Sequence, residues 1–373
     1  MSTNRSRHNP AVASAPIGRR SLIRAGAAGL ALAGAARLLA ASAASATPVA
    51  PVSRVALMSC IHQARPAPAL DHVLAYDPQV AIFAGDNVYG DVTGPAMAEL
   101  AAAYDLAGTR PALAALRSNR AVMPIWDDHD YGVNDGGADF PHKAAAKALF
   151  LKFWQIEAGD PRWMRPGLHH AAVFGPEGRR LQVILMDLRS FRTALHPAPQ
   201  GTAIPGGGRY LPAGPGARML GEDQWAWLAD CFRQPAELRL VVSSVQLVAD
   251  GHGWEGWSRM PDERARFWRL IRDTGAGGVV LLSGDRHLGA IYRRAAGPDG
   301  PPYPVTELTS SSVNLPNLAI VDEPGPNRLT PIWPLENWGR IDIDWWAGTI
   351  DLAVVDAGGI PRRRVSVSIA GIA

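Results

Sequence analysis

The chain has few cysteines, few charged residues and no long apolar run outside its N-terminus. Two cysteines among 373 residues exclude a disulfide-stapled scaffold. With 47% hydrophobic and only 19% charged residues, the composition also excludes a disordered chain. Beyond the first 46 residues no stretch approaches the roughly 20 apolar residues of a membrane helix. We therefore expect a globular protein with a sizeable core and no stable membrane span.

The formal net charge of +3 comes from the N-terminus. The first 46 residues contain six arginines, no lysine and no acidic residue. Without them the chain has 31 basic and 34 acidic residues, a net charge of −3. The charge balance therefore offers no support for nucleic-acid-specific binding.

The N-terminal segment has the pattern of an export signal. Residues 18–24 contain paired arginines, an apolar stretch follows over 25–40, and small residues continue to 46. Arg37 interrupts this stretch, whose roughly 16 weakly apolar residues are too few to span a bilayer. The pattern resembles a twin-arginine signal, so we expect recognition by the twin-arginine export machinery and a periplasmic or secreted location. The predicted divisions are a signal peptide over 1–46, a linker over 47–52 and one domain over 53–373.

Six short apolar runs, each followed by a polar residue, predict buried strands. Helical candidates lie between several of them, which favours an α/β fold. In such sheets ligands collect at the carboxyl ends of the strands, so polar residues from all six ends should form one site. The runs are 55–58, 80–84, 121–125, 181–186, 238–242 and 278–282, and the helical candidates are 96–106, 143–155, 222–232 and 262–273.

Two other stretches differ from this pattern. Residues 196–218 are rich in proline and glycine, which predicts a long surface loop at the rim of the site. Residues 340–345 alternate apolar and polar, as a half-buried strand does. We expect strands after Thr306 to complete the same domain.

Acidic and histidine residues gather at three of the predicted strand ends. Asp86 lies on a glycine turn three residues before Tyr89, residues 126–131 place three carboxylates around one imidazole, and residues 283–287 add an Asp-x-His. Alone, the Gly-Asp-Asn string is more often a simple turn and His287 a hydrogen-bonded core histidine, and the Asp-Asp-His string is as often a solvated loop or a helix cap. Together they point to a multivalent metal centre, because crowded carboxylates repel one another unless a cation neutralises them.

These motifs resemble the alkaline phosphatase D (PhoD-like) family of metallophosphoesterases, over roughly residues 54–346. The resemblance implies a metallophosphoesterase-type β-sandwich of two mixed sheets flanked by helices, with the site at the carboxyl ends of the strands. It also implies a hydrolase that cleaves phosphomonoesters or phosphodiesters, whether small molecules or polymers. The matching strings are 85–89, 126–135, 187–192, 283–287, 307–312 and 336–340.

The resemblance implies a first metal held by a thiolate, a carboxylate, a phenolate and an imidazole. Cys60 stands where the wider fold has an aspartate, and Asp86 is the bridging ligand. This donor set suits Fe(3+). His62 remains a rival for the slot given to Tyr89. The implied ligands are Cys60, Asp86, Tyr89 and His287.

A second metal would be shared through Asp86 and held by Asp128 and Asp285, again as the resemblance implies. Carboxylates replace the amide and imidazole donors of the family pattern, so the site is all-oxygen. Ca(2+) fits best, with Mg, Mn or Zn as alternatives. The family's remaining histidine has no counterpart after the run 238–242, where Gln246 is the nearest candidate oxygen donor.

The expected reaction is attack of metal-bound hydroxide on phosphorus. His129, next to Asp128, is the predicted catalytic residue that protonates the leaving oxygen. Arg189 and Arg192 are the predicted substrate-binding residues, because a guanidinium matches phosphate oxygens, and Arg286 is a further candidate. Surface salt bridges remain the simpler interpretation of these arginines.

A different class of function also fits part of the sequence. An exported, calcium-stabilised binding protein without catalytic activity would use the acidic cluster as a structural site and the twelve tryptophans as a binding face. Such a site has no use for Cys60, Tyr89 and His287 at separate strand ends. A disulfide between Cys60 and Cys231 also remains open, and it would remove the thiolate from the metal.

Overall fold

The computed structural model describes residues 50–319 and 323–373. The chain divides into two units, residues 1–41 and 42–373, and all described residues lie in the second. The predicted signal peptide over 1–46 lies outside the described residues, as does the predicted linker up to residue 49. Among the described residues, no helix is both long and apolar enough to cross a membrane.

The first sheet combines a parallel half with an antiparallel half. The parallel strands are buried along most of their length, which explains their continuous apolar sequence. The antiparallel strands lie toward the other edge and alternate more clearly. From edge to edge the sheet contains β14 (Pro361–Ser368), β13 (Thr349–Asp356), β12 (Asn337–Asp344), β1 (Arg54–Met58), β2 (Val80–Ala84) and β3 (Ala121–Ile125).

The second sheet has four parallel strands between two antiparallel edge strands. Their parallel direction brings the carboxyl ends of the four central strands to one edge of the sheet. From edge to edge the sheet contains β10 (Gly289–Arg294), β11 (Val305–Ser310), β9 (Val279–Ser283), β8 (Leu238–Ser243), β5 (Leu181–Leu185) and β4 (His170–Phe174).

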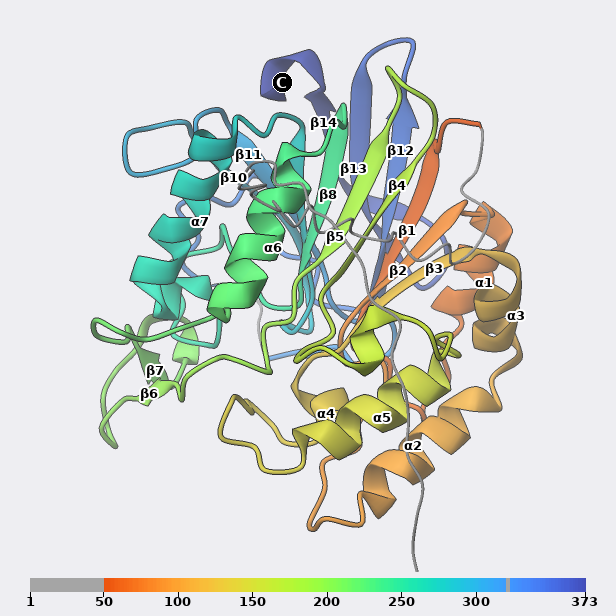
Figure 1. Ribbon diagram of the computed structural model, residues 1–373, viewed down its shortest axis with the longest axis vertical. Coiled ribbons are helices and arrows are strands. Elements are labelled where there is room, and N and C mark those ends of the chain that lie inside the picture. The colour runs from red at the N-terminus through yellow and green to blue at the C-terminus, as the bar shows by residue number, and fades with distance from the viewer. Residues whose placement is uncertain (1–49, 320–322) are drawn as a thin grey trace, which may run out of the picture. The chain divides into compact units, whose positions relative to one another are not determined.

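Helices cover the outer faces of the two sheets (Figure 1). On one side lie α6 (Glu222–Arg233) and α7 (Pro261–Thr274), and on the other lie α1 (Ala69–Tyr76) and α3 (Pro111–Asn119). The sequence sets the limits of α7: proline and two acids occupy its first turn, and Gly275 ends it with φ 66°. At one end of the sheets lie α2 (Ala98–Gly108), α4 (Asp128–Tyr131) and α5 (Lys143–Phe153) (Figure 1).

The two faces of the second sheet serve two different hydrophobic cores. In β5, Val183 and Leu185 pack into the core shared with the first sheet, whereas Ile184 packs beneath the helices α6 and α7. In β8, Leu240 and Val241 divide in the same way. This alternation follows from the two-residue period of a strand.

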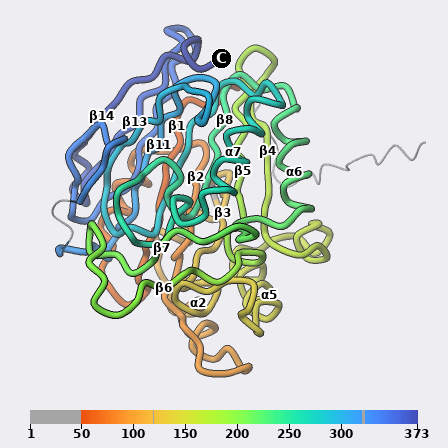
Figure 2. The backbone as a smooth tube through the Cα atoms, turned by 90° about the vertical axis from the view of Figure 1, so that its left-hand side faces the viewer, coloured from red at the N-terminus to blue at the C-terminus, as the bar shows by residue number. Residues whose placement is uncertain are grey.

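The predicted α/β class, a sandwich of two mixed sheets flanked by helices, is confirmed. All six apolar runs form strands, and the four helical candidates correspond to α2, α5, α6 and α7. The predicted loop 196–218 contains two short paired strands, β6 (His196–Pro197) and β7 (Tyr210–Leu211). Figures 1 and 2 both place β6 and β7 at the same end of the sheets as α2 and α5.

Candidate metal centre

The predicted metal ligands lie on sharp turns that directly follow strands. Cys60, Asp86 and Asp285 each lie two residues beyond a strand end, after β1, β2 and β9. Their φ angles are 55°, 50° and 66°, and His287 has φ 54°. Left-handed backbone costs residues other than glycine about 1–3 kcal/mol each and is concentrated at functional sites. The chain therefore bears backbone strain at the points where these side chains turn toward one another.

Two glycines allow these strand ends to come close together. Gly85 has φ 96°, and a Cβ atom there would lie 2.4 Å from the Cβ atom of Asp127. A Cβ atom on Gly284 would lie 2.4 Å from Oγ of Ser59. Because no side chain fits in either place, glycine is required in both Gly-Asp turns.

The four residues predicted for the first metal form one cluster. The Tyr89 hydroxyl donates to Oδ2 of Asp86 at 3.2 Å and lies 2.9 Å from Nε2 of His287. The Cys60 thiol donates to the same carboxylate oxygen at 3.5 Å. Ligand atoms of Cys60, Asp86 and His287 all lie within 4.8 Å of one another. Three donors, from Cys60, Tyr89 and His287, thus converge on Asp86.

His62, the rival for the slot of Tyr89, has a different place. Its ring stacks on the Tyr89 ring, with centroids 5.4 Å apart and planes inclined by 15°. Its Nδ1 accepts a hydrogen bond from the backbone N–H of Ala64 at 3.2 Å. The geometry therefore favours the Tyr89 hydroxyl as the donor within the cluster, with His62 packed against its ring.

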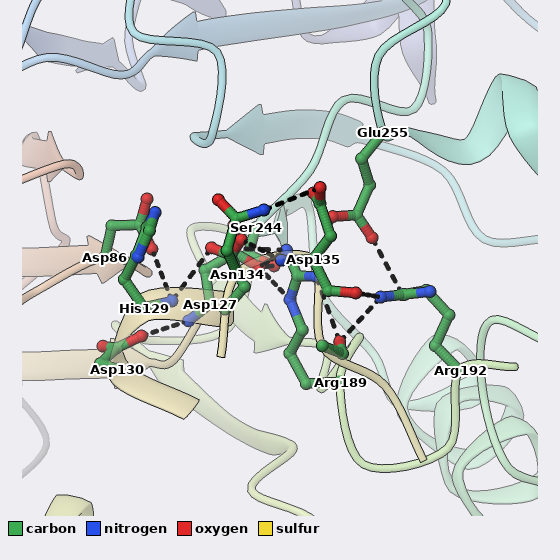
Figure 3. A network of polar contacts seen from close by, with 12 residues as sticks. Asp86, Asp127, His129, Asp130, Asn134, Asp135, Arg189, Arg192, Ser244 and Glu255 are labelled. Carbon is green, nitrogen blue, oxygen red and sulfur yellow. Dashed lines mark hydrogen bonds and ion pairs between the residues drawn. The ribbon is translucent and has the colours of Figure 1, made fainter. Parts of the chain in front are cut away.

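The residues predicted for the second metal are also close together. Asp128 lies in one group with Asp86 and in another with Asp127 and Asp285, each with ligand atoms within 4.8 Å of one another. Asp135 and Glu255 form a third such group around Asp128. The backbone N–H of Asp135 donates to Oδ2 of Asp128 at 2.7 Å. Asp128 is thus the centre of the acidic side of the site. Figure 3 shows Asp86, Asp127, Asp135 and Glu255, the acids grouped with it.

A short helix positions Asp128 and His129. The Asp130 carboxylate accepts the backbone N–H of Asp127, where α4 begins, at 2.5 Å. It also binds the side-chain amide of Asn87, which follows Asp86. Gly132, with φ 113°, ends the helix. Asp130 thereby ties the turn after β2 to the turn after β3.

Most of these groups are buried, and burial disfavours their charged forms unless a positive charge lies beside them. It raises the pKa of the Cys60 thiol to about 11 and raises the pKa of Tyr89 well above its usual range. Burial and a neighbouring acid also raise the pKa of Asp86 and of Asp285 well above the usual value. A multivalent cation would supply the missing positive charge. Thiolate, phenolate, imidazole and carboxylate donors at one point suit such an ion.

Asp128 differs from Asp86 and Asp285 because the positive charge of an arginine offsets the negative charge of its carboxylate. Burial acts to raise its pKa, but the charges of Arg189 and His129 outweigh burial and hold the pKa below its usual range. Arg189 also forms buried ion pairs with Asp127 at 2.5 Å and Glu255 at 2.8 Å. The acidic side of the site thus contains its own interior counter-charge.

Arg189 and Arg192, the predicted substrate-binding residues, lie in the interior of the protein. Their exposed fractions are 0% and 1%, and neither lines the pocket. Nε of Arg192 lies 2.9 Å from Oε1 of Glu255, and its terminal nitrogen donates to the carbonyl of Gly136 at 2.7 Å. Both guanidinium groups are thus occupied by acids and carbonyls of the protein interior. The two guanidinium groups thus lie behind the carboxylates around Asp128 and outside the pocket lining.

His129 faces the pocket and has an acidic partner. Its Nδ1 lies 2.9 Å from Oδ1 of Asp91, and its ring packs against Tyr89 with centroids 4.4 Å apart. Burial acts to lower the pKa of His129, but Asp86 and the hydrogen bond to Asp91 outweigh it and raise the pKa to about 10. The imidazole is thus suited to hold a proton beside the acidic cluster.

The pocket is a cavity of about 130 Å³ over the acidic cluster. Arg209 comes from the loop predicted to form the rim. Asn134 and Asp135 belong to the motif over residues 126–135, but the motif predicts no role for them. No signal pointed to Glu255, which lies in an irregular segment. Pocket residues not predicted from the sequence are Asn134, Asp135, Arg209, Trp254, Glu255 and Asn317.

Other predicted alternatives are also placed by the structure. After β8 the Ser244 hydroxyl donates to Oδ1 of Asp127 at 2.7 Å, while the Gln246 amide donates to Thr309 at 2.9 Å. Cys60 and Cys231 are both buried free thiols, so the disulfide that would remove the thiolate is not formed.

Comparisons with known proteins agree with this geometry. Residues 164–329 match the family model of the PhoD-like phosphatases. The fold is similar to a solved structure of PhoD, with a TM-score of 0.62 and 14% identity over 86% of this chain and 69% of that chain. It is also similar to GAP50, the anchor in the inner membrane complex of Plasmodium, with a TM-score of 0.53 and 13% identity over 85% of this chain and 89% of that chain. Among curated proteins no match to the sequence is found. Residues 164–329 therefore match the PhoD-like phosphatase family model, in a chain whose fold is similar to that of PhoD.

Proposed function

We propose that this protein is an exported, binuclear metal-dependent phosphoesterase that hydrolyses organic phosphate esters. The observation that carries the proposal is the convergence of Cys60, Tyr89 and His287 on Asp86, beside the carboxylates around Asp128. A PhoD-like phosphatase domain independently supports a phosphoester hydrolase. Export rests on the N-terminal sequence pattern, with delivery to the periplasm or outside the cell.

The donor sets suggest which ion each half of the site would hold. Cys60, Tyr89 and His287 would hold Fe(3+), with Asp86 shared between the ions. Asp128 and Asp285 offer only oxygen, which favours Ca(2+), or Mg, Mn or Zn in its place. When bound, the two cations would activate a water molecule as nucleophile and neutralise negative charge on the phosphoryl oxygens.

The chain's own residues account for the proton that the leaving group needs. His129 lines the pocket, and its Nδ1 is paired with Asp91, which leaves Nε2 to donate a proton to the departing oxygen. Asp91 acts as a positioning residue that fixes the orientation of the ring. Arg286 lines the pocket too, and it replaces Arg189 and Arg192 as the candidate for contact with the phosphoryl group.

A purely structural calcium site explains less of the geometry. It would account for the carboxylates around Asp128 but not for the thiol and the phenol that meet at Asp86. The binding-protein alternative is therefore not favoured.

The test is metal analysis of the exported protein together with turnover of 4-nitrophenyl phosphate and bis(4-nitrophenyl) phosphate. We expect iron and a second divalent ion, and hydrolysis of at least one of the two esters. Chelation should abolish turnover, and added metal should restore it. Metal-loaded protein that hydrolyses neither ester would contradict the proposal.

A further inference from the structure

Arg209 is the most exposed cation that lines the pocket. Its side chain is 57% exposed, and its terminal nitrogen lies 3.1 Å from Oδ2 of Asp135. Asp135 in turn donates its backbone N–H to Asp128. Asp135 therefore lies between the guanidinium group of Arg209 and Asp128, one of the acids proposed to hold metal. The guanidinium group itself lies at the mouth of the pocket.

The loop that carries Arg209 is fixed to the rest of the protein. The backbone N–H groups of Arg209 and Tyr210 both donate to the carbonyl of Gly253, at 2.9 and 2.8 Å. Gly208 lies so close to Gly253 that a Cβ atom would come within 1.9 Å of its carbonyl carbon. Arg259 donates to the carbonyl of Tyr210 at 3.0 Å. The backbone of Arg209 is thus held in place although its side chain is exposed.

Trp254 connects this exposed arginine with a buried one. The guanidinium carbon of Arg209 lies 5.4 Å from the centroid of the Trp254 ring, and that of Arg286 lies 5.6 Å from it. The indole N–H donates to the carbonyl of Gly206 at 2.8 Å, which fixes the ring. Arg286 is buried, pairs with Glu323 at 2.7 Å, and has an Nε atom without a hydrogen-bond partner. Stacking on an aromatic ring orients a guanidinium group and leaves its edge free to bind oxyanions.

The acids at the mouth do not cancel this positive charge. Glu255 is paired with the interior arginines Arg189 and Arg192. Asp135 is a partner that a substrate can exchange, because the Arg209 side chain is 57% exposed and Oδ2 of Asp135, itself only 16% exposed, keeps the Tyr210 hydroxyl as a donor. An incoming oxyanion can therefore take the place of Asp135 at Arg209 at little energetic cost.

We propose that Arg209, oriented by Trp254, binds a second oxyanion of the substrate, a carboxylate or a phosphate, separate from the phosphoryl group that is cleaved. This inference rests on the proposed function, because it assumes that the phosphoryl group binds at the acidic cluster. Its consequence is specificity: esters that carry a second negative group are favoured over esters that carry only one. Arg209 is thus a specificity-determining residue.

Equilibrium binding of phosphonates to the metal-loaded protein tests the inference without turnover. Propylphosphonate and 3-phosphonopropanoate share a chain of three carbons, but the terminal methyl group of the first is a carboxylate in the second, and ethane-1,2-diphosphonate replaces that carboxylate with a second phosphonate. Calorimetry should show the two ligands with a second oxyanion binding about threefold to tenfold more tightly than propylphosphonate. In Arg209→Ala this ratio of affinities should fall to about one. In Arg209→Lys it should be intermediate, because lysine keeps the positive charge but cannot donate two parallel hydrogen bonds to an oxyanion.

Arg233→Ala is the matched control, since Arg233 is 62% exposed and pairs with Asp230 on α6. It should leave the ratio unchanged. A ratio that persists in Arg209→Ala, or an equal loss of affinity for all three phosphonates, would overturn the inference. A protein that shows the ratio but hydrolyses no phosphate ester would refute the proposed function and leave the anion site standing. A protein that hydrolyses a phosphate ester but binds all three phosphonates equally well would refute the anion site and leave the proposed function standing.

Discussion

His129 is predicted to supply the proton for the leaving oxygen, and the test is to compare esters with different leaving groups. An alkyl phosphate such as glycerol phosphate needs that proton, whereas 4-nitrophenolate leaves with little help. His129→Ala should therefore reduce kcat on the alkyl ester about 100-fold or more, within the usual range for general acid catalysis. On 4-nitrophenyl phosphate the loss should be less than about tenfold.

The contribution of Asp91 can be estimated from its surroundings. It pairs with His129 at 2.9 Å, but its own side chain is 47% exposed, so the pair contributes about 1 kcal/mol or less. Asp86 and Asp128 also favour the protonated form of His129. Asp91→Asn should consequently reduce kcat on the alkyl ester only about threefold to fivefold. The variant that carries both Asp91→Asn and His129→Ala should be no slower than His129→Ala alone, because Asp91 acts through the imidazole.

These rates must be measured on protein whose metal content equals that of the wild type, since Asp128 is adjacent to His129. Asp105→Asn, an exposed acid on α2, is the control for loss of a negative charge. If His129→Ala keeps its metals and turns over the alkyl ester at the full rate, the role of His129 as acid is refuted.

Three further predictions concern the supports of the site. Glu255→Gln leaves two buried arginines without their shared carboxylate and should lower the free energy of unfolding, measured by urea titration, by about 3–5 kcal/mol. The control Glu177→Gln, at an exposed position, should change it by less than about 0.5 kcal/mol. Equal stability of both variants would contradict the ion-pair network. Gly85→Ala forces a Cβ atom against Asp127 and should reduce metal content and stability together, as measured by metal analysis and thermal unfolding; normal metal content would show that the close approach is not needed. Removing metal with a chelator should lower Tm, and adding metal back should restore it, because ions that bind only the folded state stabilise it; a Tm that chelation does not change would count against resident metal.

The sheets were predictable because burial on both faces leaves a direct mark on the sequence. Strands such as β2 and β9 are apolar throughout, and their ends are marked by Gly-Asp pairs. The convergence of Asp86 and Asp128 follows from the same pattern, since parallel strands of one sheet end at one edge. His287 follows β9 of the second sheet, so its place beside them depends on how the two sheets pack. Short helices such as α1 and α3 carry too few turns to produce a clear period, and they were missed.

The support and the rim of the site could not be predicted in the same way. Arg189 and Arg192 lie in a strand-end motif, and only tertiary packing shows that they are enclosed by acids and carbonyls. Glu255 and Arg209 come from irregular segments whose sequence has no period. Their positions depend on contacts such as Gly208 against Gly253, which join residues distant in sequence.

The most direct test of the central claim is the visible absorption spectrum of the purified protein, with its iron content. Ligation of Fe(3+) by Tyr89 and Cys60 predicts a charge-transfer band that Tyr89→Phe abolishes or shifts. Tyr76→Phe is the control, because the hydroxyl of Tyr76 bonds to Ile341 and Asp342 of β12 instead of Asp86. This change should leave the band intact. A colourless, iron-free wild-type protein, or a band that persists unchanged in Tyr89→Phe, would contradict the account.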